Sequence, residues 1–504
     1  MMETEGMKRH LPPLISGVAL VFCFPTFDLY PLAWVALAPF LVSVYGMSPR
    51  NAFRAGFFMG VPYFFGTQYW IYHSINHYGG IPLLPSLAIV LLLSFYMSLY
   101  TAAFASLFSY KMSRSKLPAM LLAPLLWVCL EYLRSYALTG FPWSSIGYTQ
   151  YKFLPVIQIA DMTGVYGVSY LVVAVNGALA DIFIARRRKR RMPLFSLTPT
   201  ATGGVVLAAA ILGILLYGHM RLNEKRPGAA MRVGIVQGNI EQDVKWDPAY
   251  QSEVTGVYKE MTVAVNDRRP DLIVWPETAV PFYFGADEKL TAELMDFQKG
   301  LDAYLLFGAV TVKADGRLAN SAILLGRGGP ALYAYDKIHL VPFGEYVPLK
   351  GALFFIDKLA AGIGDYVPGK EHIKAQTPMG KFGTLICYEI IFPGLVRKFY
   401  QKDGDFIVTI TNDAWFGDTT GPYQHFSMAV LRAVENRKPV IRAANTGVSG
   451  FIDSSGRILK RSSLFQRQAL TENVHTDSTR SFYSRWGDLF AYLSIVLCLL
   501  IFMA

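Results

Sequence analysis

Long apolar runs, separated by short segments that contain basic residues, fill the chain up to about Asn223. A helix that crosses a bilayer takes about 20 mostly apolar residues. The pattern predicts eight such helices, near Leu11–Phe27, Leu29–Met47, Phe53–Tyr72, Leu83–Tyr110, Leu117–Tyr136, Leu154–Ala185, Val205–Met220 and Leu489–Ala504. The first two are separated only by a turn around Pro25–Asp28 and also fit one re-entrant pair. We therefore expect a seven-helix transmembrane domain at 1–227 and a closing transmembrane helix at 481–504.

Between Met231 and Arg480 the pattern changes to short apolar runs of strand length that alternate with helical stretches. Asn223–Ala230, with charges, a proline and a glycine, is the predicted linker. Strands are predicted at Arg232–Val236, Leu272–Trp275, Tyr304–Val312, Ser321–Leu325, Phe382–Cys387, Phe406–Thr411, Val440–Ala443 and Gly450–Asp453. Helices are predicted at Ala249–Asn266, Lys289–Leu301, Gly394–Tyr400 and Tyr423–Asn436. This alternation predicts one α/β domain with a buried sheet at 228–480.

The charges support a membrane protein and indicate its orientation. The chain is 53% hydrophobic and 16% charged, whereas soluble domains are roughly a quarter charged. Basic residues gather at alternate ends of the predicted spans: Lys8 and Arg9; Arg50 and Arg54; Lys111, Arg114 and Lys116; and 186–191. Such ends face the cytoplasm, so we expect the polar domain on the opposite side. A net charge of +11 also suits nucleic-acid binding, but the alternation with the spans favours topology, and no nucleic-acid partner is expected.

The N-terminal run has the basic start and short apolar core of a signal peptide. It lacks small residues at a cleavage site, since 21–23 is Val-Phe-Cys, so we expect it to be retained.

The cysteines draw attention to one residue. Cys23, Cys129 and Cys498 lie in predicted membrane helices, whereas Cys387 is alone in the polar stretch. A compartment beyond the membrane is expected to be oxidising, so a lone thiol there needs a reason. Free cysteine is often a small buried hydrophobe; the alternative is a nucleophile, activated by a nearby base or cation.

Three segments of the polar stretch concentrate reactive groups at predicted strand ends and loops, where α/β folds build sites. They are IVWPE ending at Glu277, YDKIHLVPFGEYVP with Lys337 and Glu345, and LICYE with Cys387, Tyr388 and Glu389. These groups suit acyl transfer. Glu277 is the candidate base for the Cys387 thiol, and Lys337 with a backbone N–H is the candidate oxyanion support.

Each of these residues also has a structural interpretation. Glu277 also fits a cap of the helix that follows, and Lys337 a solvated surface lysine. For Glu345 and Glu389 a supporting role through ion pairs or hydrogen bonds is favoured, with Tyr388 beside them.

The ordered WPE, DK-x-H-L-V-P-F-GE-Y-V-P and CYE segments resemble the carbon–nitrogen hydrolase (nitrilase) superfamily. That resemblance implies an αββα sandwich and a triad of Glu277 as base, Lys337 as oxyanion stabiliser and Cys387 as nucleophile. The whole chain resembles the apolipoprotein N-acyltransferase family, on the further segments QGNIEQDVKW (237–246), TNDAWFG (411–417), RAANTGVSGFID (442–453) and TGFPWSSIGYTQ (139–150).

The second resemblance implies a multi-pass protein of the bacterial inner membrane with its catalytic domain in the periplasm. Cys387 is then expected to take an acyl chain from a phospholipid, typically phosphatidylethanolamine. The thioester would pass this chain to the α-amino group of a diacylglyceryl-cysteine lipoprotein, the last step of lipoprotein maturation. No metal and no cofactor are expected.

Lipid substrates lead to two further hypotheses. Withdrawing an acyl chain into water costs about 0.8 kcal/mol per CH₂. The apolar cluster in Leu349–Ala361, which contains Phe354 and Phe355, is therefore a candidate membrane-facing arm, with a core helix as the alternative. Trp246 and Trp415 are candidate substrate-binding aromatics, which the resemblance places near the site; core packing is the alternative for both.

Other readings explain less of the chain. His73 and His77 share a helix face and suit metal binding, but no carboxylate or cysteine lies nearby in sequence, so interfacial polar residues are favoured. The histidines of the polar stretch, His339, His372, His425 and His475, permit a Cys–His site.

Two rival functions remain. One is a membrane-tethered amidase or nitrilase that acts on small molecules. The other is a transporter with a binding module, which predicts charges deep in the spans. The spans have few central charges, apart from Glu131 and Arg134 near a helix end.

Overall fold

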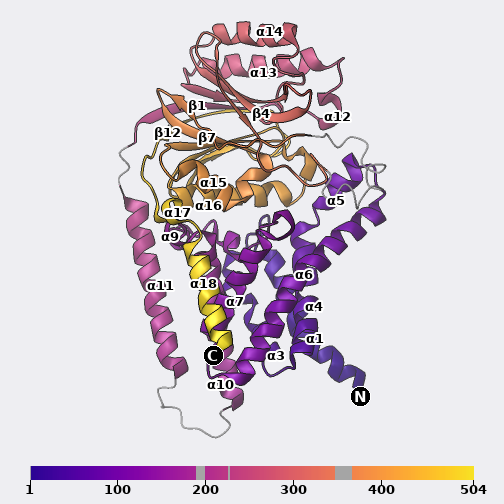
Figure 1. Cartoon of the computed structure of the whole chain (residues 1–504), viewed down its shortest axis with the longest axis vertical. Helices are drawn as coiled ribbons and strands as arrows, with labels where there is room; N and C mark the ends of the chain where they lie inside the picture. Colours follow the sequence, from indigo (N-terminus) through magenta and orange to yellow (C-terminus); the bar gives the residue numbers. More distant parts are fainter. Residues whose placement is uncertain (1, 189–198, 225–227, 347–365) are drawn as a thin grey trace. The chain divides into compact units, whose positions relative to one another are not determined.

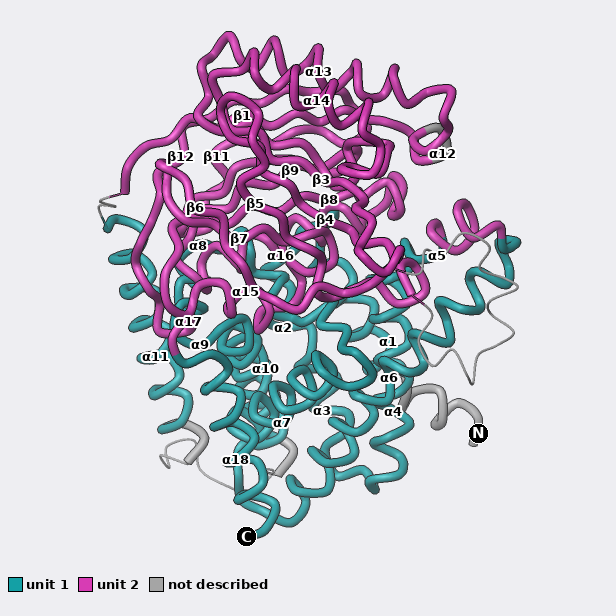
Figure 2. The backbone as a smooth tube through the Cα atoms, turned by 45° about the horizontal axis from the view of Figure 1, so that its top comes forward, with its two compact units in different colours: residues 1–72, 81–224, 486–504 teal, residues 73–80, 225–485 magenta. Residues whose placement is uncertain are grey.

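The computed structural model describes residues 2–188, 199–224, 228–346 and 366–504. These residues form two compact units, drawn in teal and magenta in Figure 2. The helical unit comprises residues 1–72, 81–224 and 486–504, and the α/β unit comprises residues 73–80 and 225–485. The segment Leu349–Ala361, our candidate membrane-facing arm, lies outside the described residues.

Helices account for nearly all regular structure of the helical unit. They are α1 (Met2–Phe22), η1 (Tyr30–Leu32), α2 (Ala33–Ala36), α3 (Ala38–Val44), α4 (Pro49–Gln68), α5 (Ile71–His73), α6 (Leu83–Arg114), α7 (Ala119–Arg134), η3 (Ala137–Thr139), η4 (Ile146–Gln150), α8 (Leu154–Ile157), α9 (Ala160–Thr163), α10 (Val165–Arg188), α11 (Pro199–Asn223) and α18 (Leu489–Met503). Among the described residues, three helical stretches are long and apolar enough to cross a membrane, at Leu83–Arg114, Val165–Arg186 and Thr202–Asn223. Shorter apolar helices lie at Leu11–Phe22, Tyr30–Val44 and Leu489–Met503.

Two predicted spans are interrupted. The range Leu154–Ala185 was predicted as one helix, but the structure has α8, α9 and then α10, which follows Gly164. Gly164 has a φ of 63°, a left-handed conformation that glycine adopts without the steric cost of a Cβ and that ends a helix. The range Leu29–Met47 is divided into η1, α2 and α3, with a proline in the first turn of both η1 and α3.

Small residues and buried caps hold this bundle together. A Cβ added to Gly56 of α4 would lie 2.3 Å from the Thr101 backbone oxygen of α6, so this glycine permits close packing of the two helices. Asp181 of α10 accepts hydrogen bonds from the backbone N–H groups of Ala119 and Met120 at 2.8 and 3.0 Å. It thereby caps the first turn of α7, whose N–H groups have no partner within the helix.

The α/β unit consists of two six-stranded sheets, ordered β12-β1-β2-β3-β4-β5 and β11-β10-β9-β8-β7-β6. The strands are β1 (Ala230–Gln237), β2 (Leu272–Val274), β3 (Tyr304–Val312), β4 (Leu318–Leu325), β5 (Ala331–Asp336), β6 (Ala375–Thr377), β7 (Gly380–Ile386), β8 (Phe406–Thr411), β9 (Val440–Ala444), β10 (Gly450–Ile452), β11 (Ile458–Arg461) and β12 (Gln468–His475). Its helices are η2 (Ser74–Tyr78), α12 (Gln242–Lys245), α13 (Gln251–Asn266), α14 (Glu288–Lys299), η6 (Cys387–Ile391), α15 (Pro393–Tyr400), η7 (Asp413–Phe416), α16 (Gly421–Asn436) and α17 (Phe482–Trp486).

The two sheets pack face to face, and each outer face is covered by helices (Figure 1). Helices α13 and α14 lie on the first sheet, and α15 and α16 lie on the second. This is the predicted αββα sandwich. Parallel pairs β1–β2, β2–β3, β7–β8 and β8–β9 form the centres of the sheets, so their polar strand-end residues emerge at common edges.

The sequence pattern located the central strands and missed β5, β6, β11 and β12. The central strands β2 and β8 are buried throughout. In β12, which reads Gln-Ala-Leu-Thr-Glu-Asn-Val-His, only Leu470 and Val474 are buried. An edge or half-exposed strand needs few apolar residues, so its pattern resembles that of a loop.

An aromatic cluster between α13 and the first sheet fixes the end of β2, the strand that leads to Glu277. Trp275 is fully buried, and its ring stacks on Tyr258 of α13 with centroids 5.2 Å apart. The Trp275 indole N–H donates to the Thr262 hydroxyl at 2.8 Å, which satisfies its single polar group. The end of β2 is therefore rigidly placed.

Candidate active site

Glu277 stands in a turn directly after β2. The backbone N–H of Gly308 on β3 donates to the Pro276 carbonyl at 3.0 Å, which ties this turn to the neighbouring strand. A Cβ at Gly308 would lie 2.4 Å from the Thr278 nitrogen and 2.6 Å from the Glu277 Cα. Glycine at position 308 is therefore what allows the turn to lie against the strand.

The Glu277 carboxylate is buried and receives donors from three other segments. The side-chain amide of Asn320 on β4 donates to Oε1 at 2.8 Å, and the backbone N–H of Asn412 donates to Oε2 at 2.8 Å. The Lys337 ammonium lies 3.4 Å from Oε1. The helix cap that we considered for Glu277 is not what the structure shows, because its side chain bonds to these separate strands.

Lys337 follows β5 and lies between two carboxylates. Its Nζ is 2.9 Å from Glu345 Oε1, and its side chain is 1% exposed. Burial alone would lower its pKa, but the Glu345 and Glu277 carboxylates outweigh burial, and the pKa lies above the ordinary lysine value. Lys337 is therefore a buried cation, and the alternative of a solvated surface lysine is wrong.

Glu345 supports this cation. Its Oε1 also accepts the Asn320 amide at 2.8 Å, and its Oε2 accepts the Val341 backbone N–H at 2.8 Å. Because both carboxylates need a donor from Asn320, its side-chain nitrogen must face them. Sequence reasoning missed Asn320; its only signal was a polar residue inside an apolar strand.

Cys387 comes directly after β7 in a tight turn. Its φ is 51°, a left-handed conformation that is uncommon for a residue with a Cβ and that often marks functional positions. We had placed it in the strand, but β7 ends at Ile386. Burial and the Glu277 charge raise the pKa of the thiol, and the Lys337 charge opposes them. The resting group is therefore a thiol.

Glu389 joins the cysteine turn to the lysine loop. Its carboxylate accepts the backbone N–H of Ile386 at 2.8 Å and the backbone N–H of Ile338 at 2.7 Å. It also accepts the Tyr335 hydroxyl at 2.7 Å. Burial raises the Glu389 pKa to about 7, although these hydrogen bonds act in the opposite direction. Tyr388 is buried, and its ring lies against Phe392 with centroids 5.0 Å apart.

A second buried network supports the cysteine turn. His425 Nε2 lies 3.2 Å from the Cys387 carbonyl oxygen, and Nδ1 lies 2.9 Å from Asp413 and 3.0 Å from the Arg442 guanidinium. Burial and Arg442 lower the His425 pKa, which favours the neutral ring. His425 thus touches the Cys387 main chain, which gives no support to the Cys–His alternative.

The two candidate aromatics lie in loops of this unit. Trp246 follows α12 and lies near Tyr283, with ring centroids 6.0 Å apart. Trp415 in η7 is 39% exposed, and its ring packs edge-on against Tyr78 at 4.7 Å. Their exposure leaves both accessible to a substrate, and their role in binding stays a prediction.

The histidine pair that we considered for metal binding lies in the α/β unit. The His73 and His77 rings stack with centroids 5.1 Å apart. Within the described ranges, no group of three or more His, Cys, Asp or Glu residues is arranged to hold a metal ion.

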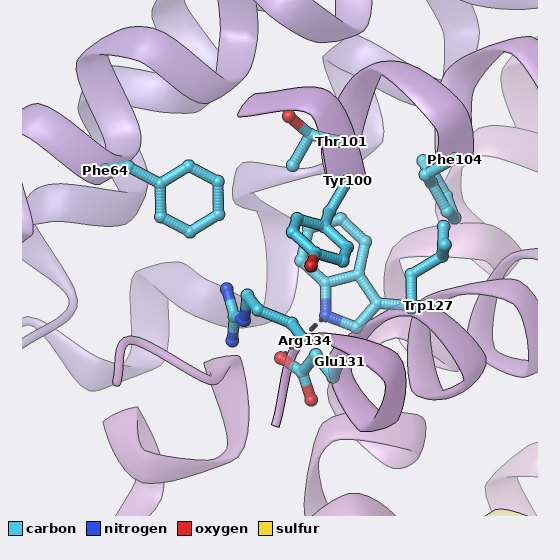
Figure 3. A pocket seen from close by; sticks show the side chains of 8 residues that line it. Phe64, Tyr100, Thr101, Phe104, Trp127, Glu131 and Arg134 are labelled. Atoms are coloured by element: carbon cyan, nitrogen blue, oxygen red, sulfur yellow. Dashed lines mark hydrogen bonds between the residues drawn. The ribbon is translucent and has the colours of Figure 1, made fainter. Parts of the chain in front are cut away.

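The helical unit contains a cavity with buried charges, shown in Figure 3. Phe64, Tyr100 and Trp127 line it together with Glu131 and Arg134 near the end of α7. Glu131 Oε1 accepts the Trp127 indole N–H at 2.9 Å and the Ile146 backbone N–H at 2.8 Å. Arg134 donates to the Ser145 hydroxyl at 2.9 Å. Both charged residues therefore fasten the 144–146 loop to α7.

Comparison with known proteins places this arrangement in a family. Residues 16–178 match the family described as apolipoprotein N-acyltransferase N-terminal domain, and residues 232–483 match the carbon-nitrogen hydrolase family. The apolipoprotein N-acyltransferase of Geobacter metallireducens is 42% identical over 494 residues, which cover 97% of this chain and 93% of that protein. The chain belongs to the apolipoprotein N-acyltransferase family.

A second relative agrees with this assignment. The apolipoprotein N-acyltransferase of Haemophilus influenzae is 33% identical over 98% of this chain and 94% of that protein. An amidase from Nesterenkonia sp. aligns with 53% of this chain and 97% of its own chain, with 18% identity and a TM-score of 0.40. Membership of the apolipoprotein N-acyltransferase family confirms the predicted nitrilase-like fold and acyltransferase class, and it disfavours the amidase alternative.

Proposed function

We propose that Cys387 carries a fatty acyl chain, as a thioester, from a phospholipid to the amino terminus of a diacylglyceryl-cysteine lipoprotein. The chain is an acyltransferase of the apolipoprotein N-acyltransferase family, and its substrates are a phospholipid and a lipoprotein. The residues that perform the transfer are our proposal. The observation that carries it is the buried contact of Lys337 with Glu277 and Glu345, together with the Glu277 and Lys337 charges that act on the Cys387 thiol.

In the first step, Glu277 accepts the thiol proton while the sulfur attacks the ester carbonyl of the phospholipid. A base is needed at this moment because burial keeps the thiol protonated at rest. Negative charge develops on the carbonyl oxygen, and Lys337 with a backbone N–H of the cysteine turn stabilises it. The ester C–O bond then breaks, and the lysophospholipid leaves with the proton from Glu277.

In the second step, the lipoprotein α-amine attacks the thioester carbonyl. Glu277 accepts a proton from the amine, the C–S bond breaks, and the Cys387 sulfur recovers a proton from Glu277. The product is an amide, and the enzyme returns to its starting state. Glu345 holds the Lys337 ammonium through its 2.9 Å contact.

Several finer points belong to the same proposal. Phosphatidylethanolamine is the proposed donor, and Trp246 and Trp415 are proposed substrate contacts. The basic residues at alternate helix ends support a periplasmic catalytic domain at 228–480, with 1–227 and 481–504 in the bacterial inner membrane.

Acyl labelling tests the nucleophile directly. Purified protein in detergent is incubated with phosphatidylethanolamine carrying a labelled acyl chain, and the mass of the peptide containing Cys387 is measured. We expect one acyl addition, which a diacylglyceryl peptide with a free α-amine removes as the labelled amide. Phosphatidylglycerol with the same chain tests the headgroup.

The matched controls are Cys387→Ala and Cys23→Ala, because Cys23 is also a buried free thiol. Label should vanish in the first variant and persist in the second. Acyl transfer that survives in Cys387→Ala would refute the assignment. Hydrolysis of small amides without any acylation by phospholipid would instead support the tethered amidase.

A further inference from the structure

A second lysine is buried directly behind Glu277. Lys245, at the end of α12, is 0% exposed. Its Nζ donates to the Glu277 backbone carbonyl at 3.1 Å and to the Thr278 hydroxyl at 2.8 Å. A fully buried ammonium is costly unless charge and hydrogen bonds compensate it. The mechanism described above assigns no role to this group.

The charges of the site call for a second cation. Glu277 and Glu345 bring two carboxylates into a region where their side chains are 7% and 12% exposed. Lys337 contacts both carboxylates and neutralises only one of them. Lys245 is electrostatically coupled to Glu277 and, when protonated, balances the second carboxylate.

The contacts also fix the main chain that aims Glu277. Thr278 has a φ of 45°, a left-handed conformation that a β-branched residue adopts only when its surroundings hold it. Lys245 binds the two polar groups of this turn on one side, and Gly308 leaves room for β3 on the other. Gln242, on the same short helix as Lys245, accepts the Asn412 side-chain amide at 2.6 Å, and the Asn412 backbone N–H donates to Glu277.

The titration of Lys245 is consistent with this coupling. Burial lowers its pKa to about 7, and the Glu277 carboxylate opposes the shift. Glu277 is the charged group that acts on it from the β2 turn, while Thr278 and Asn412 present neutral groups nearby. The Lys245 ammonium and the Glu277 carboxylate therefore attract each other across this turn.

We propose that Lys245 is a positioning residue for Glu277: it holds the peptide turn that aims the carboxylate and supplies a second positive charge beside the two buried carboxylates. This inference rests on the proposed role of Glu277 as the base. Lys245 itself need not touch the thiol, the ester or the amine.

The expected consequence depends on pH in a way that a merely structural role would not produce. Below about pH 7 the native Lys245 is an ammonium that attracts the Glu277 carboxylate, and Lys245→Met lacks this ammonium. At alkaline pH Lys245 of the native enzyme has lost its charge as well. The two enzymes should therefore converge as pH rises.

The test compares Lys245→Met with the native enzyme in the rate of Cys387 acylation by labelled phosphatidylethanolamine between pH 6 and pH 9. We expect the rate to fall by about 10-fold or more at pH 6, and by less than about 3-fold at pH 9. A reduction by the same factor at every pH, or no reduction, would overturn the proposal. Thr278→Val removes one acceptor, keeps the β-branched shape and should give a weaker effect of the same sign.

Lys438→Met is the matched control. Lys438 is 1% exposed, and its ammonium donates to the Asp477 and Thr479 backbone carbonyls at 2.5 and 2.6 Å. It therefore reproduces the loss of a buried, carbonyl-bound ammonium, and its charged neighbours do not include Glu277. The rate of Cys387 acylation in Lys438→Met should depend on pH as it does in the native enzyme.

Failure of this inference can be separated from failure of the proposed function. If the native enzyme is never acylated on Cys387, the proposed function fails. The pH dependence of Cys387 alkylation by iodoacetamide then still decides on Lys245. A loss of alkylation rate in Lys245→Met that is larger at pH 6 than at pH 9, and that is absent in Lys438→Met, supports the coupling; identical profiles in the two variants refute it.

Discussion

Both units bury charged side chains, but they use them differently. In the α/β unit, Glu277, Lys337 and Glu345 come from separate strand ends and loops, and Lys337 contacts both carboxylates. In the helical unit, Glu131 and Arg134 stand three residues apart on one helix and bond to aromatic, backbone and hydroxyl partners. Within the described residues, Glu131 Oε2 and Arg134 Nε have no hydrogen-bond partner.

The difference shows that burial of charge does not by itself mark a reaction site. Glu131 and Arg134 fasten a loop to the helix that carries them, a task that needs no proton transfer. The charges of Glu277 and Lys337 both act on Cys387, which lies in a strained turn. A base and a cation beside a thiol suit transfer of the thiol proton. The relevant signal is convergence of opposite charges, from distant segments, on a nucleophile.

Of the substitutions that test this comparison, Lys337→Met should give the largest losses of stability and of acylation. It leaves two buried carboxylates without their shared cation, so we expect a loss of about 3–5 kcal/mol in the free energy of unfolding. Loss of the oxyanion support should also lower acylation of Cys387 by about 1,000-fold. Denaturant unfolding and acyl labelling measure the two quantities. Lys313→Met, at a partly exposed pair with Asp336, should cost less than about 1 kcal/mol and leave acylation unchanged.

Gly308→Ala should weaken the site without removing any of its functional groups. The added methyl collides with the Thr278 nitrogen and Glu277 Cα, so the base shifts and acylation falls by about 100-fold. Gly256→Ala is the matched control, because Gly256 lies in α13 and a Cβ there meets nothing within 4 Å. It should raise stability by roughly 0.5–1 kcal/mol. Equal acylation in both variants would contradict the tight fit of the Glu277 turn.

The pH dependence of stability should report the burial of Glu389. Its pKa rises from an unfolded value near 4.5 to about 7, so between these values the folded protein holds a proton that the unfolded chain has released. Stability from this group is thus present below pH 4.5 and declines as pH rises towards 7. Thermal unfolding in detergent across this range measures the slope. Glu389→Gln should flatten the slope of stability against pH. An unchanged slope would show that groups other than Glu389 cause the pH dependence.

Glu131→Gln should give the smallest effect. Glutamine keeps an oxygen for Trp127 and Ile146 and places its amide nitrogen where the carboxylate oxygen has no partner, so we expect a change of less than about 1 kcal/mol. The same substitution at Glu277 removes the proton acceptor and should lower acylation by about 100- to 10,000-fold. Similar losses of acylation in both variants would erase the distinction between the two units.

Several features of this protein follow from its sequence. The apolar runs and basic clusters predict a helical membrane domain. Continuous apolar residues predict the buried central strands. Glu277 and Cys387 stand out because each follows such a strand within a distinctive local motif. Lys337 stands out by its motif alone, since it follows the edge strand β5 that the pattern missed. Local composition and spacing carry this information, since strand and helix periodicity depend on neighbouring residues.

Tertiary structure decided the rest. Asn320, Asn412, His425 and Lys245 surround the proposed triad, yet each lies tens of residues or more from most of its partners, and no local pattern distinguishes it from an ordinary polar residue. Edge strand β12 and the break at Gly164 likewise depend on pairing and packing across long stretches of chain. The sequence by itself determined which chemical groups are present at the strand ends. Only the fold decided which buried donors and charges meet them, because contact energies depend on distances that sequence separation does not set.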